Sequence, residues 1–305
     1  MLRRSHRVCP LQAPRGRRTQ VRMPSLGALG RWVETTRFFE GNPLVRLIPG
    51  ATAPTVSPPA LGKERPVDPD TGIAFRSVMD FSGDAWTDPG ALGRTWHELD
   101  DVVMGGRSES HVRIIKTAWG RALQLEGFTT TDGGGGFVSA RTRNFRPALN
   151  LSGYDGLRLR VEGDGQRYKF CIRDNVGWWY STVFEYAFDT VKDTWVDVSF
   201  AFNDMVHIER DNRRAPQRRT LDPAKIFSFQ IILSRYDYGR EVNPLFGPGE
   251  MQISIASIDA WRSVELAKQA PPAQAATPAT RLPATRPGKE ETIGEFVERM
   301  QQREG

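Results

Sequence analysis

The densest group of chemically useful side chains lies between Trp96 and Ser110. Two adjacent carboxylates are followed there by two glycines and two serines. Loop carboxylates can accept hydrogen bonds from backbone amides, bind a cation or a sugar hydroxyl, or contact a partner protein. Two successive glycines indicate a sharp chain reversal whose backbone angles other residues resist. The pattern favours a structural loop over a ligand site but leaves both open. We call this segment the motif loop; its key residues are Asp100, Asp101, Met104, Gly105, Gly106 and Ser108.

Catalytic patterns are not found elsewhere in the sequence. No serine lies in the G-x-S-x-G pattern of a nucleophile elbow. The four histidines have no Cys or His at metal-ligand spacing, and Cys171 lies in an apolar run that predicts a buried, inert thiol. Glycines 133–136 precede a strand rather than a helix, which favours a tight turn or close backbone packing over a phosphate-binding loop. The sequence therefore predicts no catalytic residues, no metal site and no cofactor.

Two other segments could contact a partner. Residues 178–180 are consecutive aromatics, and because neighbouring strand residues point to opposite faces, at least one is expected on a loop or rim. They could equally cap one end of the fold. Residues 206–219 carry five arginines against two acids, which indicates a solvated basic loop able to contact an acidic client, an anionic lipid surface or RNA. The candidate partner-binding residues are Trp178, Trp179, Arg210, Arg213, Arg214, Arg218 and Arg219.

Short strands must position these residues. Between residues 73 and 262, apolar and polar residues alternate in short runs separated by turn signals, and long helical periodicity is absent. The pattern predicts an all-β antiparallel sandwich or barrel, built as one domain. The expected strands are 74–81, 108–115, 122–128, 136–143, 157–162, 168–173, 182–188, 195–200, 226–233 and 251–258.

The flanking segments have different compositions. Residues 1–33 hold eight arginines and no acid, which predicts an organelle transit peptide, with a disordered basic tail as the alternative. Residues 34–72 are expected to form a short helix and a Pro-rich linker, and residues 263–305 an Ala/Pro-rich linker and a short C-terminal amphipathic helix. After residue 33, 34 basic residues face 36 acidic ones, so the basic pI is no argument for a nucleic-acid-binding fold.

The order of several motifs resembles a known family. Segment 101–110, DVVMGGRSES, resembles the hallmark of the complex I intermediate-associated protein 30 family. Segment 134–141 resembles that family's GGFAS-R strand, and 151–157 followed by 163–168 resembles its LSGYDGL and GDG-x-Y pair. The resemblance covers about residues 75–262. It implies a galactose-binding-like jelly-roll β-sandwich with short flanking helices, and a non-enzymatic, chaperone-like assembly factor for respiratory complex I in the mitochondrion.

Three segments look more like the branch of this family in photosynthetic organisms, in which the domain is linked to plastid photosystem biogenesis. They are 38–43, 221–226 and 236–244. The alternative is therefore a plastid photosystem biogenesis factor that binds protein or RNA in the chloroplast. A carbohydrate-binding module is a weaker alternative, resting on fold analogy alone. The expected partners are membrane-complex assembly intermediates and other assembly factors, with peripheral membrane contact as a further option and RNA less favoured.

Overall fold

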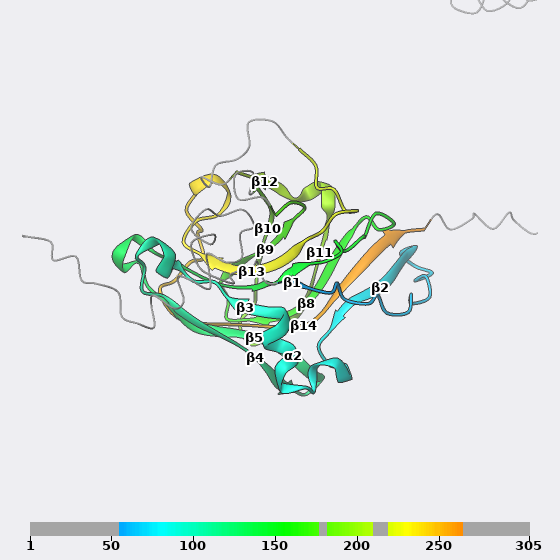
Figure 1. Cartoon of the computed structure of the whole chain (residues 1–305), viewed down its shortest axis with the longest axis horizontal. Coiled ribbons are helices and arrows are strands. Elements are labelled where there is room, and N and C mark those ends of the chain that lie inside the picture. The colour runs from blue at the N-terminus through cyan, green and yellow to red at the C-terminus, as the bar shows by residue number, and fades with distance from the viewer. Residues whose placement is uncertain (1–54, 177–181, 210–218, 265–305) are drawn as a thin grey trace, which may run out of the picture. The chain divides into compact units, whose positions relative to one another are not determined.

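The structure is a computed structural model that describes residues 55–176, 182–209 and 219–264. Two antiparallel sheets enclose a hydrophobic core (Figure 1). The first sheet contains, in spatial order, β12 (Val206–Ile208), β10 (Val183–Asp189), β9 (Arg167–Arg173), β13 (Ser228–Ser234), β6 (Phe137–Thr142) and β3 (Trp96–Glu98). The second contains β11 (Trp195–Ala201), β8 (Gly156–Gly163), β14 (Gly249–Ser263), β5 (Gly120–Thr129) and β4 (Glu109–Thr117), with β2 (Ile73–Asp80) paired to the end of β14.

The chain crosses repeatedly between the two sheets. After β2 in the second sheet, β3 lies in the first, β4 and β5 in the second, and β6 in the first again. The same exchange continues through β8, the β9–β10 pair, β11, the β12–β13 pair and β14. This repeated crossing is the jelly-roll arrangement of an antiparallel sandwich. The predicted all-β jelly-roll fold class is confirmed.

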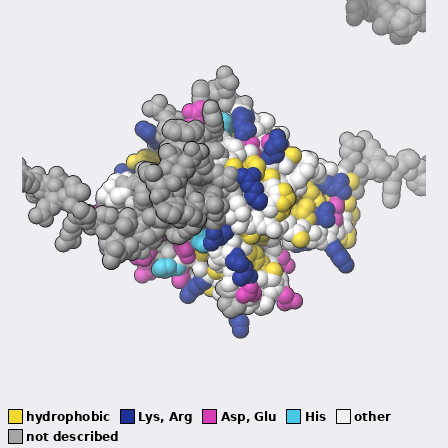
Figure 2. All heavy atoms as spheres, viewed as in Figure 1, with side chains coloured by type: hydrophobic (Ala, Val, Ile, Leu, Met, Phe, Trp, Pro, Cys, Tyr) yellow, Lys and Arg dark blue, Asp and Glu magenta, His cyan; other side chains and the backbone are white. Residues whose placement is uncertain are grey.

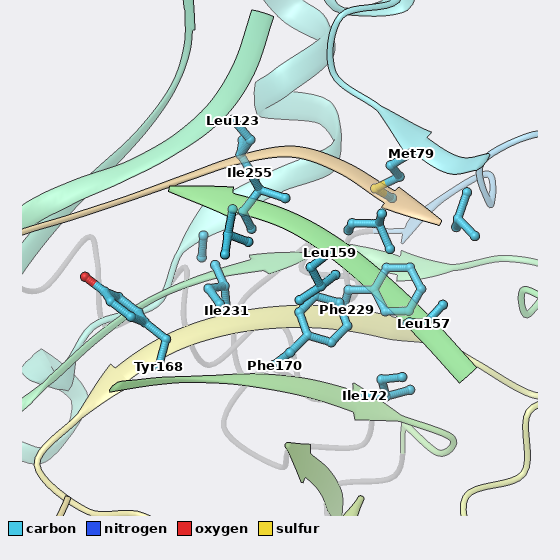
Figure 3. Close-up of a cluster of buried hydrophobic side chains, with 14 of the residues drawn as sticks. Met79, Leu123, Leu157, Leu159, Tyr168, Phe170, Ile172, Phe229, Ile231 and Ile255 are labelled. Carbon is cyan, nitrogen blue, oxygen red and sulfur yellow. The ribbon is translucent and has the colours of Figure 1, made fainter. Parts of the chain in front are cut away.

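Strict alternation of side chains builds the core. On β8, Leu157, Leu159 and Val161 are buried, whereas the charged residues between them are only half-buried. Figure 3 shows these leucines facing the aromatic and aliphatic side chains of β9 from the opposite sheet, among them Phe170 and Ile172. Burying each such side chain stabilises the fold by roughly 1.5–3 kcal/mol relative to leaving it exposed. The core therefore holds the two sheets face to face.

The last strand is the longest and occupies the centre of the second sheet. β14 pairs with β8 on one side; on the other it pairs first with β5 and then, from Ser257 onward, with β2. Its register shifts between Ile255 and Ser257 against β8, and between Ile258 and Asp259 against β2. Such irregularities bend a strand and increase its local twist. One strand can therefore serve three neighbours.

β3, β12 and α2 are among the short elements that were not predicted from the sequence. β3 and β12 have three residues each, too few to show alternation. A seven-residue helix, α2 (Pro89–Thr95), precedes β3. Its first turn is capped by the Asp88 carboxylate, which accepts a hydrogen bond from the Gly90 amide, and Pro89 occupies a first-turn position. The Asp-Pro pair is the sequence signal that could have indicated this helix.

Part of the predicted Pro-rich linker is packed against the sandwich. Two residues, β1 (Thr55–Val56), pair in parallel with β7 (Asn144–Phe145), which directly follows β6. Further along, the Gly62 amide donates to the Ser77 carbonyl at 2.9 Å, and the Arg65 amide donates to the Phe75 carbonyl at 2.8 Å. We call residues 55–65 the edge strap. Backbone hydrogen bonds to both ends fix it, although its composition alone predicted a linker.

The remaining predictions about flanking segments fall outside the described residues. These are the transit peptide at 1–33, the helix that begins the 34–72 segment, and the C-terminal linker and helix at 263–305, apart from the final residues of β14. The chain divides into two units, Met1–Glu265 and Leu266–Gly305, and every described residue belongs to the first.

Candidate partner-binding surface

Asp101 ties the motif loop to the start of β6. Its carboxylate accepts hydrogen bonds from the Ser108 amide at 3.0 Å and the Ser108 hydroxyl at 2.7 Å. It also accepts from the amides of Gly136 at 2.7 Å and Phe137 at 3.3 Å. The residue is 0% exposed. Because donors of the chain itself surround both carboxylate oxygens, this acid closes a loop and leaves little room for an external ligand.

Asp100 connects the motif loop to β4 and β6 in a similar way. Its carboxylate accepts from the Ser110 amide at 2.8 Å, the Ser110 hydroxyl at 2.6 Å and the Ser139 amide at 3.3 Å. Burial raises the pKa of this carboxyl to about 6, and the three hydrogen bonds oppose that rise only in part. The two acids therefore bind different strands, and the structure favours the structural interpretation of the motif loop.

The glycines of this region allow close approach of the backbone. A Cβ on Gly106 would lie 2.2 Å from the Asp101 carboxyl, and one on Gly135 would lie 2.1 Å from Asp101 Oδ2. Gly105 has a positive φ of 86°, in the left-handed region that favours glycine. The 133–136 glycines thus belong to close backbone packing, the interpretation favoured from sequence. For Met104 the structure describes the backbone position only, in a 3₁₀ helix, Asp101–Met104.

The aromatic and basic segments have their ends at one corner of the first sheet. Trp178 and Trp179 lie outside the described residues, in the connection from β9 to β10, and Arg210, Arg213, Arg214 and Arg218 also lie outside them, in the connection after β12. The flanking residues are described. Val183 pairs with Ile208, and the Asn175 side-chain amide donates to the Thr182 hydroxyl at 2.9 Å. The two connections therefore start and end beside each other.

Arg219 locks this corner and is not a solvated loop charge. Its guanidinium forms a two-pronged ion pair with the Asp174 carboxylate, with Nη1 donating to Oδ2 at 2.8 Å and Nη2 to Oδ1. It also lies over the Phe184 ring, 5.1 Å from the centroid. Asp174 additionally accepts from the Asp222 amide at 3.1 Å. The predicted partner contact of Arg219 stays a prediction; within the sandwich its guanidinium supplies the cationic partner that the fully buried Asp174 carboxylate needs. We call the region formed by Asp174, Phe184, Arg219 and Asp222 the Asp174 corner.

The motif loop and the Asp174 corner lie at opposite ends of the first sheet. Phe137, next to the motif loop, pairs with Ser234 at one end of β13. Arg173, next to Asp174, pairs with Ser228 at the other end. β13 has seven residues, so about 20 Å separates the two regions at ~3.3 Å per residue. The motif loop and the ends of the segments that hold the partner-binding candidates therefore lie in two separate regions of the first sheet.

A row of buried and half-buried side chains crosses the first sheet between these ends, and most of it was not predicted from the sequence. Each member pairs in register with the next strand's member, and the residues on the opposite face of these strands are mainly core residues. We call these side chains the polar row: Glu185, Cys171, Gln230, Arg141 and His97. The burial of Cys171 was predicted, but for the other members alternation indicates only which face a residue occupies and not whether that face is covered.

The polar row is held by internal pairing. Lys169, two residues before Cys171 on β9, donates to the Glu185 carboxylate at 2.9 Å, and both side chains are buried. Arg141 Nη2 donates to the Asn144 side-chain oxygen at 2.8 Å. Burial raises the pKa of the Cys171 thiol, which makes it a poor nucleophile. These groups stabilise the sheet and do not form a reaction centre.

Arg173 is an exception next to the Asp174 corner. Its Nε and Nη1 are buried and make no hydrogen bond to the part of the chain that the structure describes. Burial lowers the pKa of its guanidinium. Arg173 as a whole is half-buried, and a guanidinium whose buried donors have no partner favours a carboxylate or another anion as its neighbour. This residue was not a sequence candidate, because a single arginine at a strand end carries no distinctive pattern.

The fold and these contacts define the class of the protein as a jelly-roll β-sandwich, in which the motif loop lies at one end of the first sheet and the Asp174 corner at the other. Within the described ranges, no group of three or more His, Cys, Asp or Glu side chains could hold a metal ion. No helix in those ranges has the length and apolar character needed to cross a membrane. Residues 81–255, more than half of the 305-residue chain, match the model of the family described as Complex I intermediate-associated protein 30. The chain belongs to this family, and the predicted resemblance is confirmed.

Other comparisons give only distant likenesses. No curated protein sequence matches the chain significantly. Among solved structures, the chain is similar to a family 11 carbohydrate-binding module from Clostridium thermocellum in complex with a β-1,3-1,4-mixed-linked tetrasaccharide, with 14% identity, a TM-score of 0.44, and coverage of 63% of this chain and 97% of the module. It is also similar to the module CsCBM6-3 from Clostridium stercorarium in complex with cellobiose, with 10% identity, a TM-score of 0.25, and coverage of 55% and 93%. At these values we draw no inference about ligands.

Proposed function

We propose that this protein is a non-enzymatic assembly factor that holds an intermediate of respiratory complex I while further subunits join. Membership of the Complex I intermediate-associated protein 30 family supports a role related to complex I assembly. The proposed partners are assembly intermediates and other assembly factors, and the proposed location is the mitochondrion.

One observation carries the proposed binding surface: the Asp174 corner brings together the ends of the two segments that hold the partner-binding candidates. The β9–β10 connection carries Trp178 and Trp179, and the connection after β12 carries Arg210, Arg213, Arg214 and Arg218. Aromatic and arginine side chains dominate the binding free energy of many protein interfaces. Arg173 adds a half-buried cation next to the same corner. A client with exposed acidic groups suits this surface.

Affinity capture from isolated mitochondria tests this proposal. Tagged protein should retain complex I subunits, identified by mass spectrometry. In a triple variant, Arg213→Ser, Arg214→Ser and Arg218→Ser, the client should dissociate at lower salt, because screening shortens from ~8 Å at 0.15 M to ~3 Å at 1 M ionic strength. Arg219 stays unchanged, since it holds the fold.

A matched control removes the same charge elsewhere. Arg107, Lys116 and Lys192 are exposed and lie away from the Asp174 corner, so their replacement by Ser should leave salt resistance at the wild-type level. Equal salt resistance of both triple variants would contradict the role of the basic segment. Capture of photosystem subunits or RNA from plastids, with no complex I subunit from mitochondria, would contradict the assembly proposal itself.

A further inference from the structure

A cavity of about 940 Å³ lies under the edge strap. The strap pairs with β7, which follows β6 of the first sheet, and with β2 of the second sheet. It therefore crosses the open edge of the sandwich from one sheet to the other. The strap, β2, α2 with the turn before it, and β7 all line the cavity. None of these residues belongs to the motif loop or to the Asp174 corner.

The floor of the cavity is the hydrophobic core itself. Val78, Met79 and Phe145 line it and are also members of the core cluster. Met79 lies at one end of the cluster drawn in Figure 3. Trp86 forms a further wall, where its ring packs against Phe81 with centroids 4.8 Å apart. An apolar group that entered here would meet an apolar surface along its length, which is the usual character of a ligand pocket of ~300–1,000 Å³.

The rim of the cavity carries mainly positive charge. The lining side chains include four cations, Lys63, Arg65, Arg94 and Arg143, and a single acid, Asp80. Asp80 is engaged by the chain, since its carboxylate accepts from the Ser82 amide at 2.9 Å and hydroxyl at 2.6 Å. Figure 2 shows basic side chains beside hydrophobic ones on the face where the strap, β2 and α2 lie.

Two of these four cations form ion pairs, and Lys63 is available to bind an anion. Arg65 pairs with Asp259 at 3.2 Å, and Arg94 pairs with Asp88. Lys63 is exposed on the strap, and its ammonium has no ion-pair partner among the described residues. An anion held at this edge would therefore find a net positive field and an available ammonium donor.

We propose that this cavity binds an anionic amphiphile, with the apolar chain on the core floor and the carboxylate or phosphate group beside Lys63. The strap closes one side of the cavity, so a slender acyl chain suits it better than a helix of ~10–12 Å diameter. The ligand is either a free fatty acid or the corresponding part of a membrane lipid, since both offer an acyl chain with an anionic group. This site is independent of the client surface at the Asp174 corner.

Binding to the purified full-length chain tests the site directly. Sodium oleate, studied by calorimetry below its micelle concentration, should bind with a stoichiometry of one. Inorganic phosphate, which lacks the chain, should not bind detectably. Ala60→Trp places a large side chain in the cavity and should weaken oleate binding at least tenfold. Ala118→Trp, an equally exposed alanine in the β4–β5 turn that does not line the cavity, is its control and should bind oleate normally.

The charge contribution has its own pair of variants. Lys63→Gln should weaken oleate binding about 2–5-fold, the range of an exposed ion pair. Lys116→Gln, an exposed lysine outside the cavity, should not. The affinity for 1-dodecanol, which has no charge, should be the same in both variants.

A vesicle experiment separates the two sources of ligand. Co-sedimentation with phosphatidylglycerol vesicles that Ala60→Trp abolishes would identify a membrane lipid, whereas oleate binding without vesicle binding would identify a free acid. Oleate or vesicle binding that Ala60→Trp leaves unchanged would overturn the cavity proposal, as would no binding of either. Should Ala60→Trp lower the melting temperature, Ala85→Trp, on the opposite wall, provides the same test.

Discussion

Gly106 and Gly105 illustrate two different reasons for a glycine in one loop. A Cβ on Gly106 would overlap the Asp101 carboxyl at 2.2 Å, whereas the nearest atom to a Cβ on Gly105 is 3.9 Å away. Gly105 needs only its positive φ, which costs an alanine of order 1 kcal/mol. Gly106→Ala must displace a carboxylate that holds four donors. We therefore expect Gly106→Ala to lower the melting temperature by several degrees more than Gly105→Ala, at ~2–4 °C per kcal/mol.

Thermal unfolding, monitored by circular dichroism, gives the melting temperatures of the two variants and so their order. Gly153→Ala is the control, because a Cβ there meets nothing within 4 Å and its φ is not positive; its melting temperature should stay at the wild-type value. The reverse order for the two loop variants would mean that the Asp101 carboxylate moves aside at little cost.

Asp100 gives the fold a pH dependence of unusual sign for an acid. Its pKa rises from 3.8 to about 6 on folding, so the folded state binds the proton more tightly than the unfolded chain does. Its stabilising contribution is complete below pH ~4 and is lost as the pH rises through about 6. A shift of this size corresponds to roughly 3 kcal/mol. We expect the unfolding free energy of the wild-type protein to fall between pH 4 and 7 for this reason, and Asp100→Asn to remove most of that fall.

Urea unfolding at pH 4.5, 5.5, 6.5 and 7.5 gives the slope of unfolding free energy against pH for the wild-type protein and for Asp100→Asn. The comparison uses the change of unfolding free energy with pH, because Asn also alters the hydrogen bonds to Ser110. Asp132→Asn, at an exposed acid near the same loop, should keep the wild-type slope. A slope that Asp100→Asn does not change would show that this carboxyl titrates normally.

At the scale of elements, the Asp174 corner shows that a contact between distant segments can give a charged residue a structural role that its sequence neighbours do not indicate. Arg219 is the last of five arginines in a basic run, yet it neutralises a carboxylate 45 positions earlier. Arg219→Ser leaves Asp174 buried without its cation. Breaking a buried pair costs ~3–5 kcal/mol, and the 44% exposure of the Arg219 side chain reduces this to about 1–3 kcal/mol.

The matching measurement compares neighbours in the basic run. Arg219→Ser should lower the melting temperature by several degrees, and Arg219→Lys by less, because an ammonium keeps the charge without the two-pronged geometry. Arg214→Ser is the control: it removes the same charge from the same basic run and should melt within about a degree of the wild-type protein. Similar losses for Arg219→Ser and Arg214→Ser would contradict the special role of the corner.

Sequence patterns predicted the elements of the fold better than they predicted its sites. Alternation such as that of Leu157–Val161 indicated the long strands, and the order of the glycine-containing motifs indicated the family. Apart from Cys171, the polar row was not detected, because a polar strand face has the same sequence pattern whether it is covered or exposed to solvent. The edge strap escaped detection too, because its prolines indicate a linker while its binding to β2 depends on backbone groups that every residue possesses.

At the scale of the whole molecule, the strap changes where the folded unit begins. The sequence placed the start of the sandwich at residue 73. Residues 55–65 add backbone hydrogen bonds to β2 and β7, and ion pairs from Glu64 to Arg262 and from Arg65 to Asp259. We expect a fragment of residues 55–264 to melt several degrees higher than a fragment of residues 73–264, which loses these bonds and uncovers the core floor at Met79.

Calorimetry on the two fragments, with an apolar dye to report exposed surface, checks this boundary. The shorter fragment should bind more dye as well as melt earlier. A third fragment of residues 66–264, which lacks the strap but keeps the turn before β2, should behave like the shorter one. Equal melting temperatures of all three fragments would show that the strap does not stabilise the sandwich.

The position of β14 has a consequence for how the chain acquires its structure during synthesis. Its partners β2, β5 and β8 are all made earlier, and the pairing of Ser263 with Ile73 joins the two ends of the described sandwich. While a ribosome has not yet released Ser263, the second sheet lacks its central strand, and the edges of β2, β5 and β8 stay open. Contacts so distant in sequence form slowly and leave aggregation-prone edges exposed meanwhile. The second sheet therefore completes only once β14 has been made, and any carrier that protects the open edges of β2, β5 and β8 must stay bound until then.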